Sequence, residues 1–237
     1  MAAFALGWLV FVAWAAASFT ALEALVPRHA APLPIRRIAT AAVLLAAEGA
    51  IARALVWTDP DPASLARAAL AWLCAEAAHY AVHRAMHAVP WLWRFHRLHH
   101  GGEPLAWATA WYVHPVDAAL LAAATTLGAA VAGAGVPAML WLVVGRRAWT
   151  VVLHANLAWP PSALDGVVAT PPFHHRHHRE DLPPANFAST LPLLDQIFGT
   201  YSPSAPGRRR ARSTSATMSA AIPIAISQPA ANSTETT

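Results

Sequence analysis

Charged residues are scarce in this sequence. Asp, Glu, Lys and Arg together make up 12% of the 237 residues, about half the share that is usual in soluble domains. Hydrophobic residues make up 57% of the chain. This balance argues against an ordinary water-soluble domain and predicts an integral membrane protein.

Cysteine is almost absent, and several motifs of common enzyme classes are missing. The single cysteine, Cys74, excludes a disulfide within the chain. No glycine-rich phosphate loop, dinucleotide-binding fingerprint or Ser-His-Asp arrangement stands out. The net charge of +4 comes largely from arginines near expected membrane edges and in the C-terminal tail. Such a distribution favours membrane orientation by positive loops over nucleic-acid binding, so no nucleic-acid partner is expected.

Histidine is the residue that the sequence has in excess. Six of the thirteen histidines fall between positions 79 and 100. Eight histidines form three spaced boxes, one H-x-x-x-H and two H-x-x-H-H. The boxes consist of His83 and His87, then His96, His99 and His100, and lastly His174, His177 and His178.

The spacing of these boxes predicts a structured metal site. Helical residues three or four apart share a face, so each box should point its imidazoles at one locus. Neutral imidazole binds iron, zinc, copper or nickel, and eight such ligands exceed the needs of one ion but suit two. The boxes also lie beside apolar, tryptophan-rich segments, whereas a loose metal-binding tract is usually a polar tail.

The apolar runs predict helices. Phe4 to Leu22 and Ile38 to Trp57 are each long enough to cross a bilayer. A third helix should run from Leu65 to about Met86 and carry the first box. Pro90 should separate it from an interfacial helix that ends at Gly101 and carries the second box.

The third box would lie on the wrong side of the membrane if the uncharged stretch from Ala118 to Val144 crossed once. We therefore expect this stretch to turn back near Gly133 to Pro137 as a hairpin or re-entrant pair, with a return leg that ends at His154. Basic loops at Arg28–Arg37 and Arg84–Arg97, set against an acidic turn at 58–61, predict an outside N-terminus and cytoplasmic histidine boxes.

The expected fold class is thus all-α, an integral membrane helical bundle with a histidine-rich di-metal site on its cytoplasmic side. One domain should span 1–201, with its histidine-box core at about 76–201. The Pro-, Ser-, Thr- and Arg-rich remainder, 202–237, reads as a disordered tail.

The order of these motifs resembles the fatty acid hydroxylase/sterol desaturase superfamily. The resemblance runs from Glu76 to Tyr201 and rests on HRAMH, WRFHRLHH, His114-Pro115, HANL, HHRHH and LDQIFGTY. Glu76 stands where Asp is frequent, Phe187-Ala188 where Tyr-Gly is common, and Leu194 where Trp is frequent. None of these departures removes a box histidine, so they bear on the substrate more than on the chemistry.

The resemblance implies an O2-dependent di-iron oxygenase of the membrane. It would hydroxylate, or alternatively desaturate, a C–H bond of a lipid such as a fatty acyl chain or a sterol-like molecule. Its cofactors would be two iron ions, which zinc could replace in a purified sample. Electrons would come from a ferredoxin- or cytochrome-b5-like donor with an NAD(P)H reductase, because the chain itself shows no flavin, haem or nicotinamide motif.

Two other functions fit a histidine-rich membrane protein less well. A metal-binding or metal-transport protein would place its ligands near the bilayer midplane, whereas these boxes lie at helix ends. A zinc hydrolase needs only about three protein ligands and a general base, so eight histidines over-provide for it.

Several residues outside the boxes are further candidates for the site. His154, in the HANL segment, is predicted to be a ninth ligand, with capping of helix carbonyls as the alternative. His114 is either an extra ligand or a hydrogen-bond partner of one. Glu76 either accepts a hydrogen bond from a ligand imidazole or pairs with Arg84.

Four further residues are candidates for supporting roles at the metal site or for the substrate pocket. His79, His175 and Asp195 are candidates for extra ligands or for groups that orient a ligand. Arg147 lies on the helical stripe of His154 and is a candidate for the substrate pocket, because an arginine facing lipid would be costly.

Overall fold

Helices make up nearly all the regular structure in the computed structural model of this protein. The residues described are 13, 16–29, 65–101, 104–159 and 163–203, and every structural statement below concerns them. Beyond a helical stretch at 16–25, they form helices α3 to α8 and two 3-10 helices, η1 and η2. The only pairing of strand type among them is an isolated bridge between Pro27 and Leu157. The expected all-α class is confirmed for this part of the chain.

The first two histidine boxes lie on consecutive helices, as predicted. Helix α3 spans Leu65–Ala88 and α4 spans Pro90–His100. Val89, between them, is extended, and Pro90 occupies the first turn of α4. Proline is tolerated at that position because the first helical N–H groups lack intrahelical acceptors in any case. The proline therefore both ends one helix and starts the next.

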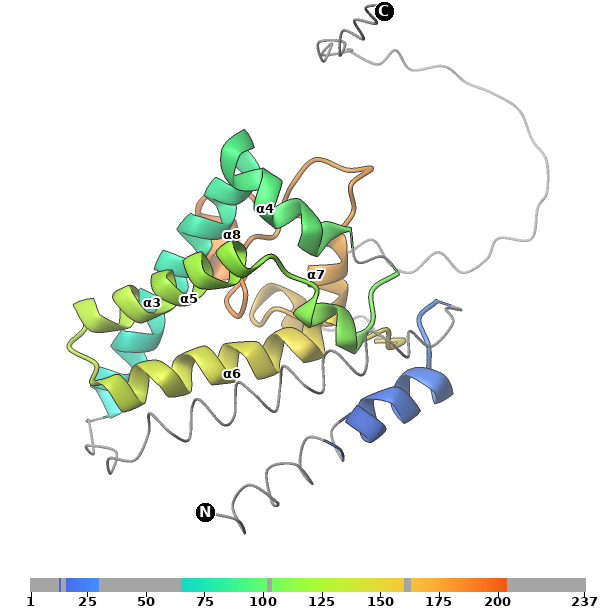
Figure 1. Ribbon diagram of the computed structural model, residues 1–237, viewed down its shortest axis with the longest axis horizontal. Coiled ribbons are helices and arrows are strands. Elements are labelled where there is room, and N and C mark those ends of the chain that lie inside the picture. Colours follow the sequence, from blue (N-terminus) through green and yellow to red (C-terminus); the bar gives the residue numbers. More distant parts are fainter. Residues whose placement is uncertain (1–12, 14–15, 30–64, 102–103, 160–162, 204–237) are drawn as a thin grey trace, which may run out of the picture. The chain divides into compact units, whose positions relative to one another are not determined.

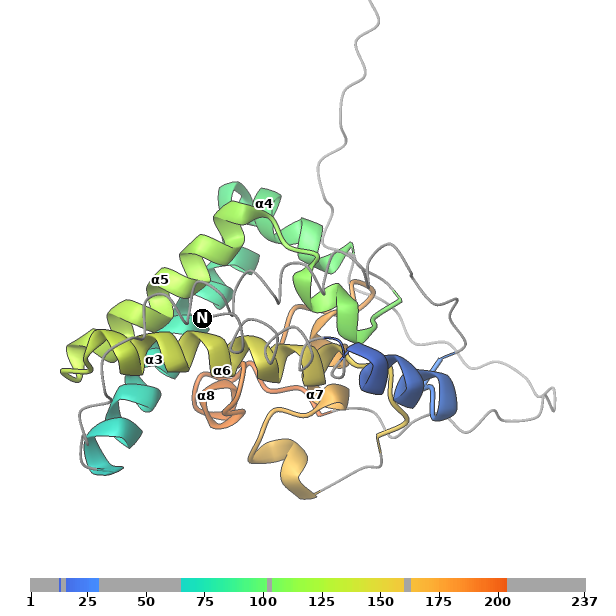
Figure 2. The same cartoon turned by 60° about the horizontal axis from the view of Figure 1, so that its bottom comes forward.

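The long uncharged stretch turns back on itself where the sequence predicts. Helix α5 spans Pro115–Val131 and α6 spans Val136–His154. Gly133, in the turn, has a φ of 72°, a left-handed conformation that glycine adopts without steric cost. The two helices meet at this turn and diverge away from it (Figures 1 and 2).

Helices α3 and α5 approach each other closely. Small residues line the contact, with Ala71 and Ala75 of α3 packed against Ala129 of α5. A Cβ atom at Gly128 would lie 2.5 Å from the backbone oxygen of Cys74. Only glycine fits there without a backbone shift, and this contact sets the position of α3 against the hairpin.

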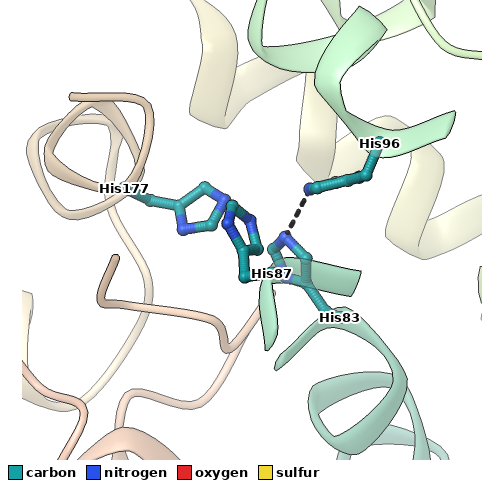
Figure 3. Close-up of side chains that lie close together, drawn as sticks. All are labelled: His83, His87, His96 and His177. Carbon is teal, nitrogen blue, oxygen red and sulfur yellow. Dashed lines mark hydrogen bonds between the residues drawn. The ribbon is translucent and has the colours of Figure 1, made fainter. Parts of the chain in front are cut away.

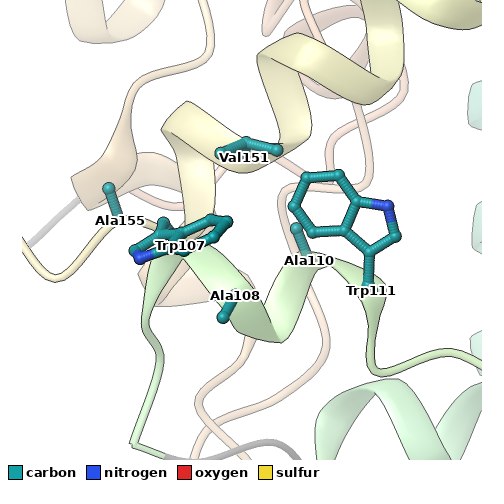
Figure 4. Close-up of a cluster of buried hydrophobic side chains, with 6 residues drawn as sticks. All are labelled: Trp107, Ala108, Ala110, Trp111, Val151 and Ala155. Carbon is teal, nitrogen blue, oxygen red and sulfur yellow. The ribbon is translucent and has the colours of Figure 1, made fainter. Parts of the chain in front are cut away.

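A tryptophan cluster fixes the loop between α4 and α5 against the end of α6. Helix η1, Trp107–Trp111, packs its two tryptophans on Val151 and Ala155 (Figure 4). Burying a large aromatic side chain stabilises a fold by roughly 1.5–3 kcal/mol. The carboxylate of Glu23 accepts the backbone N–H of Trp107 at 2.7 Å and that of Asn156 at 2.8 Å, which ties the stretch 16–25 to the same place.

A second apolar cluster packs the helix of the third box against the helix of the first box. Helix η2 spans Ala163–Gly166, α7 spans Pro171–His177 and α8 spans Leu193–Ile197. Tyr80 of α3, Phe173 of α7 and Phe187 pack together in this cluster. The short helix α7 is thereby held against the end of α3.

The predicted membrane spans fall largely outside the described residues. Only positions 13 and 16–22 of the first span are described, and none of the second. No described helix combines the length and apolarity that crossing a bilayer requires. The predicted tail, 202–237, is likewise described only at 202 and 203, so the domain boundary there stays a prediction.

Candidate metal centre

Eight imidazoles converge in two groups of four. In each group, ligand nitrogens from all four side chains lie within 4.8 Å of one another. The first histidine group consists of His83, His87, His96 and His177, whose rings face one another in Figure 3. The second histidine group consists of His99, His154, His174 and His178. Each group therefore brings together four imidazole nitrogens that could hold a metal ion.

The groups do not coincide with the boxes. We expected each box to point at one locus, and the structure corrects this for two of the three. The second box sends His96 to the first group and His99 to the second, and the third box sends His177 to the first group and His178 to the second. Residues three apart on a helix differ by about 4.5 Å along its axis and by about 60° around it. That offset is large enough to direct neighbouring histidines to two separate loci.

His154 joins the second group from the end of α6. It is fully buried, and its Nε2 lies 3.2 Å from Nε2 of His99 and 3.4 Å from Nε2 of His174. Its Nδ1 donates to the Thr150 carbonyl at 2.8 Å. The ring therefore makes the carbonyl contact of the capping alternative with one nitrogen and presents the other to the group, and its role as a ligand remains a proposal.

His100 belongs to neither group and lies between them. Its ring centroid is 4.7 Å from that of His87, 4.8 Å from that of His177 and 4.4 Å from that of His178. Its buried Nε2 has no hydrogen-bond partner among the described residues. His100 is thus the box histidine whose predicted ligand role has the least geometric support.

Backbone and carboxylate oxygens orient three rings of the first group. The Nδ1 of His83 lies 2.7 Å from the Phe187 carbonyl, and the Nδ1 of His177 lies 2.8 Å from the Ala185 carbonyl. The Nδ1 of His96 lies 3.0 Å from a carboxylate oxygen of Asp117. These oxygens accept hydrogen bonds, so each Nδ1 carries the hydrogen and each neutral ring keeps a lone pair on Nε2.

This tautomer assignment shows that the first group fits a metal ion. The Nε2 atoms of His83 and His96 are 3.1 Å apart, the contact dashed in Figure 3. Two lone pairs at that distance repel unless a cation lies between them. Imidazole nitrogens about 2.0–2.1 Å from a shared ion lie roughly 3.0–3.4 Å from each other. The buried Nε2 atoms of His87 and His177, which have no partner in the described part of the chain, complete the donor set.

The protonation state of the rings on α4 and α7 also suits metal binding. Burial, reinforced by the neighbouring imidazoles, lowers the pKa of His99, His174 and His178 well below its usual value. The same causes lower the pKa of His177. These rings are therefore neutral at pH 7, which is the form in which histidine ligates metals.

Glu76 has partners that neither sequence interpretation anticipated. It is buried and forms an ion pair with Arg146 of α6. Its carboxylate also accepts the backbone N–H groups of Ser189 at 3.1 Å and Thr190 at 2.9 Å. It does not contact a ligand imidazole, and Arg84 lies two turns further along α3, where it donates to Tyr80 at 3.5 Å. Glu76 thus joins α3, α6 and the segment after Phe187.

His114 and His79 lie outside both groups. The Nδ1 of His114 caps α5 by accepting the Val116 N–H at 3.1 Å, and its ring packs on Phe95. The structure thus shows a capping contact for His114, which neither of the two expected roles included. His79 lies one turn before His83 with ring centroids 6.0 Å apart, and it lines the adjacent cavity.

His175 and Asp195 also lie outside the two groups of ligand atoms. His175 is buried, and burial, followed by the nearby charge of Arg28, lowers its pKa to about 3. Asp195 accepts the N–H groups of Phe187 at 2.8 Å and Ala188 at 2.9 Å. Asp195 therefore binds the backbone N–H of Phe187, the same residue whose carbonyl orients His83.

A cavity of about 100 Å³ adjoins both histidine groups. Its wall includes His83 and His96 of the first group and His99 and His174 of the second. Arg147, the residue expected in the substrate pocket, also lines it and donates to the Ala110 carbonyl at 3.3 Å, while its contact with substrate remains a proposal. Leu121, Ala122 and Val143 give the wall an apolar part. A molecule in this cavity would lie against the histidines from both groups.

Sequence reasoning missed Asp117 and Arg146. Asp117 is the last charged residue before the long uncharged stretch, and it is buried beside His96. An acidic residue opening an otherwise apolar helix was the available signal. Arg146 adjoins Arg147 in sequence but faces Glu76, and no local pattern distinguishes the two arginines.

Comparison with known proteins agrees with the resemblance drawn from the boxes. A family model described as fatty acid hydroxylase matches residues 68–200. An ornithine lipid hydroxylase from Rhizobium tropici is 29% identical over 61% of this chain and 44% of its own length. A putative methylsterol monooxygenase from Dictyostelium discoideum is 33% identical over 51% of this chain and 45% of its own. No solved structure gives a significant match.

A further relative belongs to an animal. Methylsterol monooxygenase 1 from Gallus gallus is 32% identical over 54% of this chain and 43% of its own length. The chain thus spans less than half the length of these relatives. The matched region, 68–200, exceeds half of the chain and contains all eight converging histidines. This protein therefore belongs to the fatty acid hydroxylase/sterol desaturase superfamily.

Proposed function

We propose that this protein is a membrane-bound, O2-dependent di-iron oxygenase that hydroxylates a C–H bond of a lipid. One observation carries the proposal: eight imidazoles, seven of them from buried residues, form two four-nitrogen groups beside one cavity, in a chain of this family. A single catalytic zinc site needs only about three protein ligands. The doubled donor set supports two ions.

The residues that would hold the ions are those of the two histidine groups, with His100 between them. Bound iron would supply the one-electron and O2 chemistry that amino-acid side chains lack. The protein's own part is to orient the ligands and to keep the site enclosed. The carbonyls of Ala185 and Phe187 and the carboxylate of Asp117 perform the first task by fixing the Nε2 atoms toward the centre.

Hydroxylation consumes one O2, two electrons and two protons. It places one oxygen atom in the C–H bond and reduces the other to water. The chain shows no flavin, haem or nicotinamide motif, so the electrons must come from outside. We propose a ferredoxin- or cytochrome-b5-like donor that an NAD(P)H reductase recharges. Iron is the ion of the active form, and zinc would give an inactive protein because it has no redox chemistry.

The names of the relatives support a lipid substrate and favour hydroxylation over desaturation. One is called an ornithine lipid hydroxylase and two are called methylsterol monooxygenases. These substrates share an apolar body and a polar group. The cavity offers apolar side chains from α5 and the guanidinium of Arg147, which we propose contacts the polar group.

We further propose that the protein lies in the membrane with its histidine boxes on the cytoplasmic side. The composition and the uncharged runs at 4–22 and 38–57 support this location. A reporter fused after Asp61 should mark the outer side of the membrane. A cytoplasmic signal there would overturn the orientation.

Lipid profiling tests the proposed reaction directly. A host that expresses the protein should accumulate a lipid that has gained one oxygen atom, and the same host with His177→Ala should not. Loss of two hydrogen atoms would identify a desaturase instead. An unchanged lipid profile under conditions that supply iron, O2 and a reductant would overturn the enzyme assignment.

A further inference from the structure

The segment 185–188, called the carbonyl strap below, runs along the first histidine group. Its carbonyl at Ala185 accepts from His177, and its carbonyl at Phe187 accepts from His83. These two histidines come from α7 and α3, which are far apart in the sequence. One short segment therefore sets the orientation of rings that belong to two separate helices.

Asn186, between these two carbonyls, bends the strap. Its φ of 61° lies in the left-handed region, and it is the one described residue other than glycine with a positive φ. In an extended segment, carbonyls two residues apart are separated by roughly 6.6 Å. The two imidazole rings that these carbonyls orient, those of His83 and His177, have centroids only 4.6 Å apart. The bend allows both carbonyls to converge on one group, and asparagine tolerates this conformation better than most residues.

The side chain of Asn186 holds the bend in place. It is fully buried, and its amide donates to the carbonyls of Phe173 at 3.1 Å and Ser202 at 2.8 Å. Its amide oxygen accepts the Ser202 N–H at 2.7 Å. The side-chain amide is therefore engaged with the backbone at the start of α7 and after α8.

Asp195 fixes the other side of the strap. Its carboxylate accepts the N–H groups of Phe187 and Ala188 and the hydroxyl of Thr200, the last at 2.7 Å. The strap is thus bonded through its carbonyls to the first histidine group and through its amides to α8. The second histidine group has no equivalent among the described residues, since only His154 there bonds a carbonyl, within its own helix.

We propose that Asn186 is a positioning residue for the first histidine group. Its left-handed backbone and its buried amide aim the Ala185 and Phe187 carbonyls at His177 and His83 and so set the metal affinity of that group alone. The inference rests on the metal centre of the proposed function and adds that the two sites depend on different structural supports.

Cobalt(II) binding to the full-length chain tests the inference without turnover. The visible absorption of bound cobalt reports each site when the other is disabled, with His154→Ala isolating the first group and His83→Ala the second. Asn186→Ala should lower the cobalt affinity of the first group by about 10–100-fold, the usual effect of losing a group that orients a ligand. The second group should keep its affinity and its spectrum.

Asn186→Gly separates the backbone from the amide. Glycine adopts a positive φ freely, so this variant should lose less first-group affinity than Asn186→Ala, and the loss should again be confined to that group. If Asn186→Ala does not fold, the glycine variant still tests the role of the amide. Equal losses at both groups, or no loss at the first group in either variant, would overturn the inference.

Asn156 provides a matched control. It too is buried, and its side chain exchanges two hydrogen bonds with the backbone of His29, at 2.9 and 3.0 Å. Asn156→Ala should leave the first group's cobalt affinity unchanged, and a loss as large as that of Asn186→Ala would reduce the effect to general destabilisation. A wild-type chain that binds no cobalt would refute the metal centre as well. If the wild-type chain binds two ions and the Asn186→Ala chain binds both with the same affinities, only this inference would be refuted.

Discussion

Each of the two histidine groups contains four imidazoles, but the rings of the two groups are supported differently. In the first group, three of the four rings donate Nδ1–H to an oxygen of the protein. In the second group, His154 alone does so. The buried Nδ1 atoms of His99, His174 and His178 have no partner in the described part of the chain. Ring packing is their main support, as in the pair His154 and His174, whose centroids are 4.5 Å apart.

This difference teaches that equal ligand sets need not make equal metal sites. A hydrogen bond to Nδ1 fixes both the tautomer and the angle of a ring and raises its basicity. The first group is thus arranged for an ion before one binds. The Nε2 atoms of the second group lie at similar separations, 3.1–3.4 Å, but fewer hydrogen bonds hold its rings there. We therefore expect it to hold its ion less tightly.

The largest effect should come from two adjacent residues that serve different groups. His177→Ala should remove the ion of the first group only, and His178→Ala that of the second only. Each variant should fall from two ions per chain to one, and each should lose product formation to background, because the proposed reaction uses both ions. Elemental analysis and lipid profiling give the two readouts. Retention of full activity by either variant would contradict the two-metal proposal. Loss of both ions in each variant would show that the two groups act as one site.

Removal of metal by a chelator should reveal the difference in support. The second group should release its ion about 10–100-fold faster than the first, the range associated with groups that orient a ligand. Cobalt-loaded protein mixed with a chelator should therefore lose absorbance in two phases. His154→Ala should abolish the fast phase. A fast phase that disappears with His83→Ala would reverse the assignment.

A single carboxylate should account for part of the first group's advantage. Asp117→Asn keeps the size of the side chain but removes the charge that faces His96. We expect a roughly 10-fold loss of metal affinity at the first group, measured by cobalt titration. Asp181→Asn is the control, because its ion pair with Arg179 is exposed and includes no member of either histidine group. Equal effects of the two substitutions would contradict a specific role for Asp117.

The smallest effect should arise outside both groups, in the cavity that they share. Arg147→Ala should leave two ions per chain while raising KM by roughly 10-fold, which corresponds to the loss of one hydrogen bond to a charged group. Arg147→Lys should recover part of the loss. Steady-state kinetics with the lipid that profiling identifies, together with metal analysis, checks both statements. If Arg147→Ala lost metal, we would conclude that Arg147 supports the metal centre and does not act in substrate binding.

Much of the local structure could be predicted because its causes are local. The break at Pro90, the turn near Gly133 and the end of α6 at His154 follow from residues whose backbone preferences act within a few positions. The spaced boxes also identified seven of the eight clustered histidines, and the HANL context added the eighth, His154. His100, at the end of the second box, shows the limit of this reasoning, because box spacing does not determine which histidine completes a group.

The sequence by itself determined the helices, the supply of ligands and the family. Only the tertiary structure decided how the ligands divide, because the direction of an imidazole depends on the helix packed opposite it. The partner of Glu76 was likewise decided by packing. Arg146 of α6, which packs against α3, forms the ion pair with Glu76 that the sequence did not indicate. The carbonyls of Ala185 and Phe187 leave no mark in the sequence, since every residue has a carbonyl and only the bend at Asn186 aims these two at histidines.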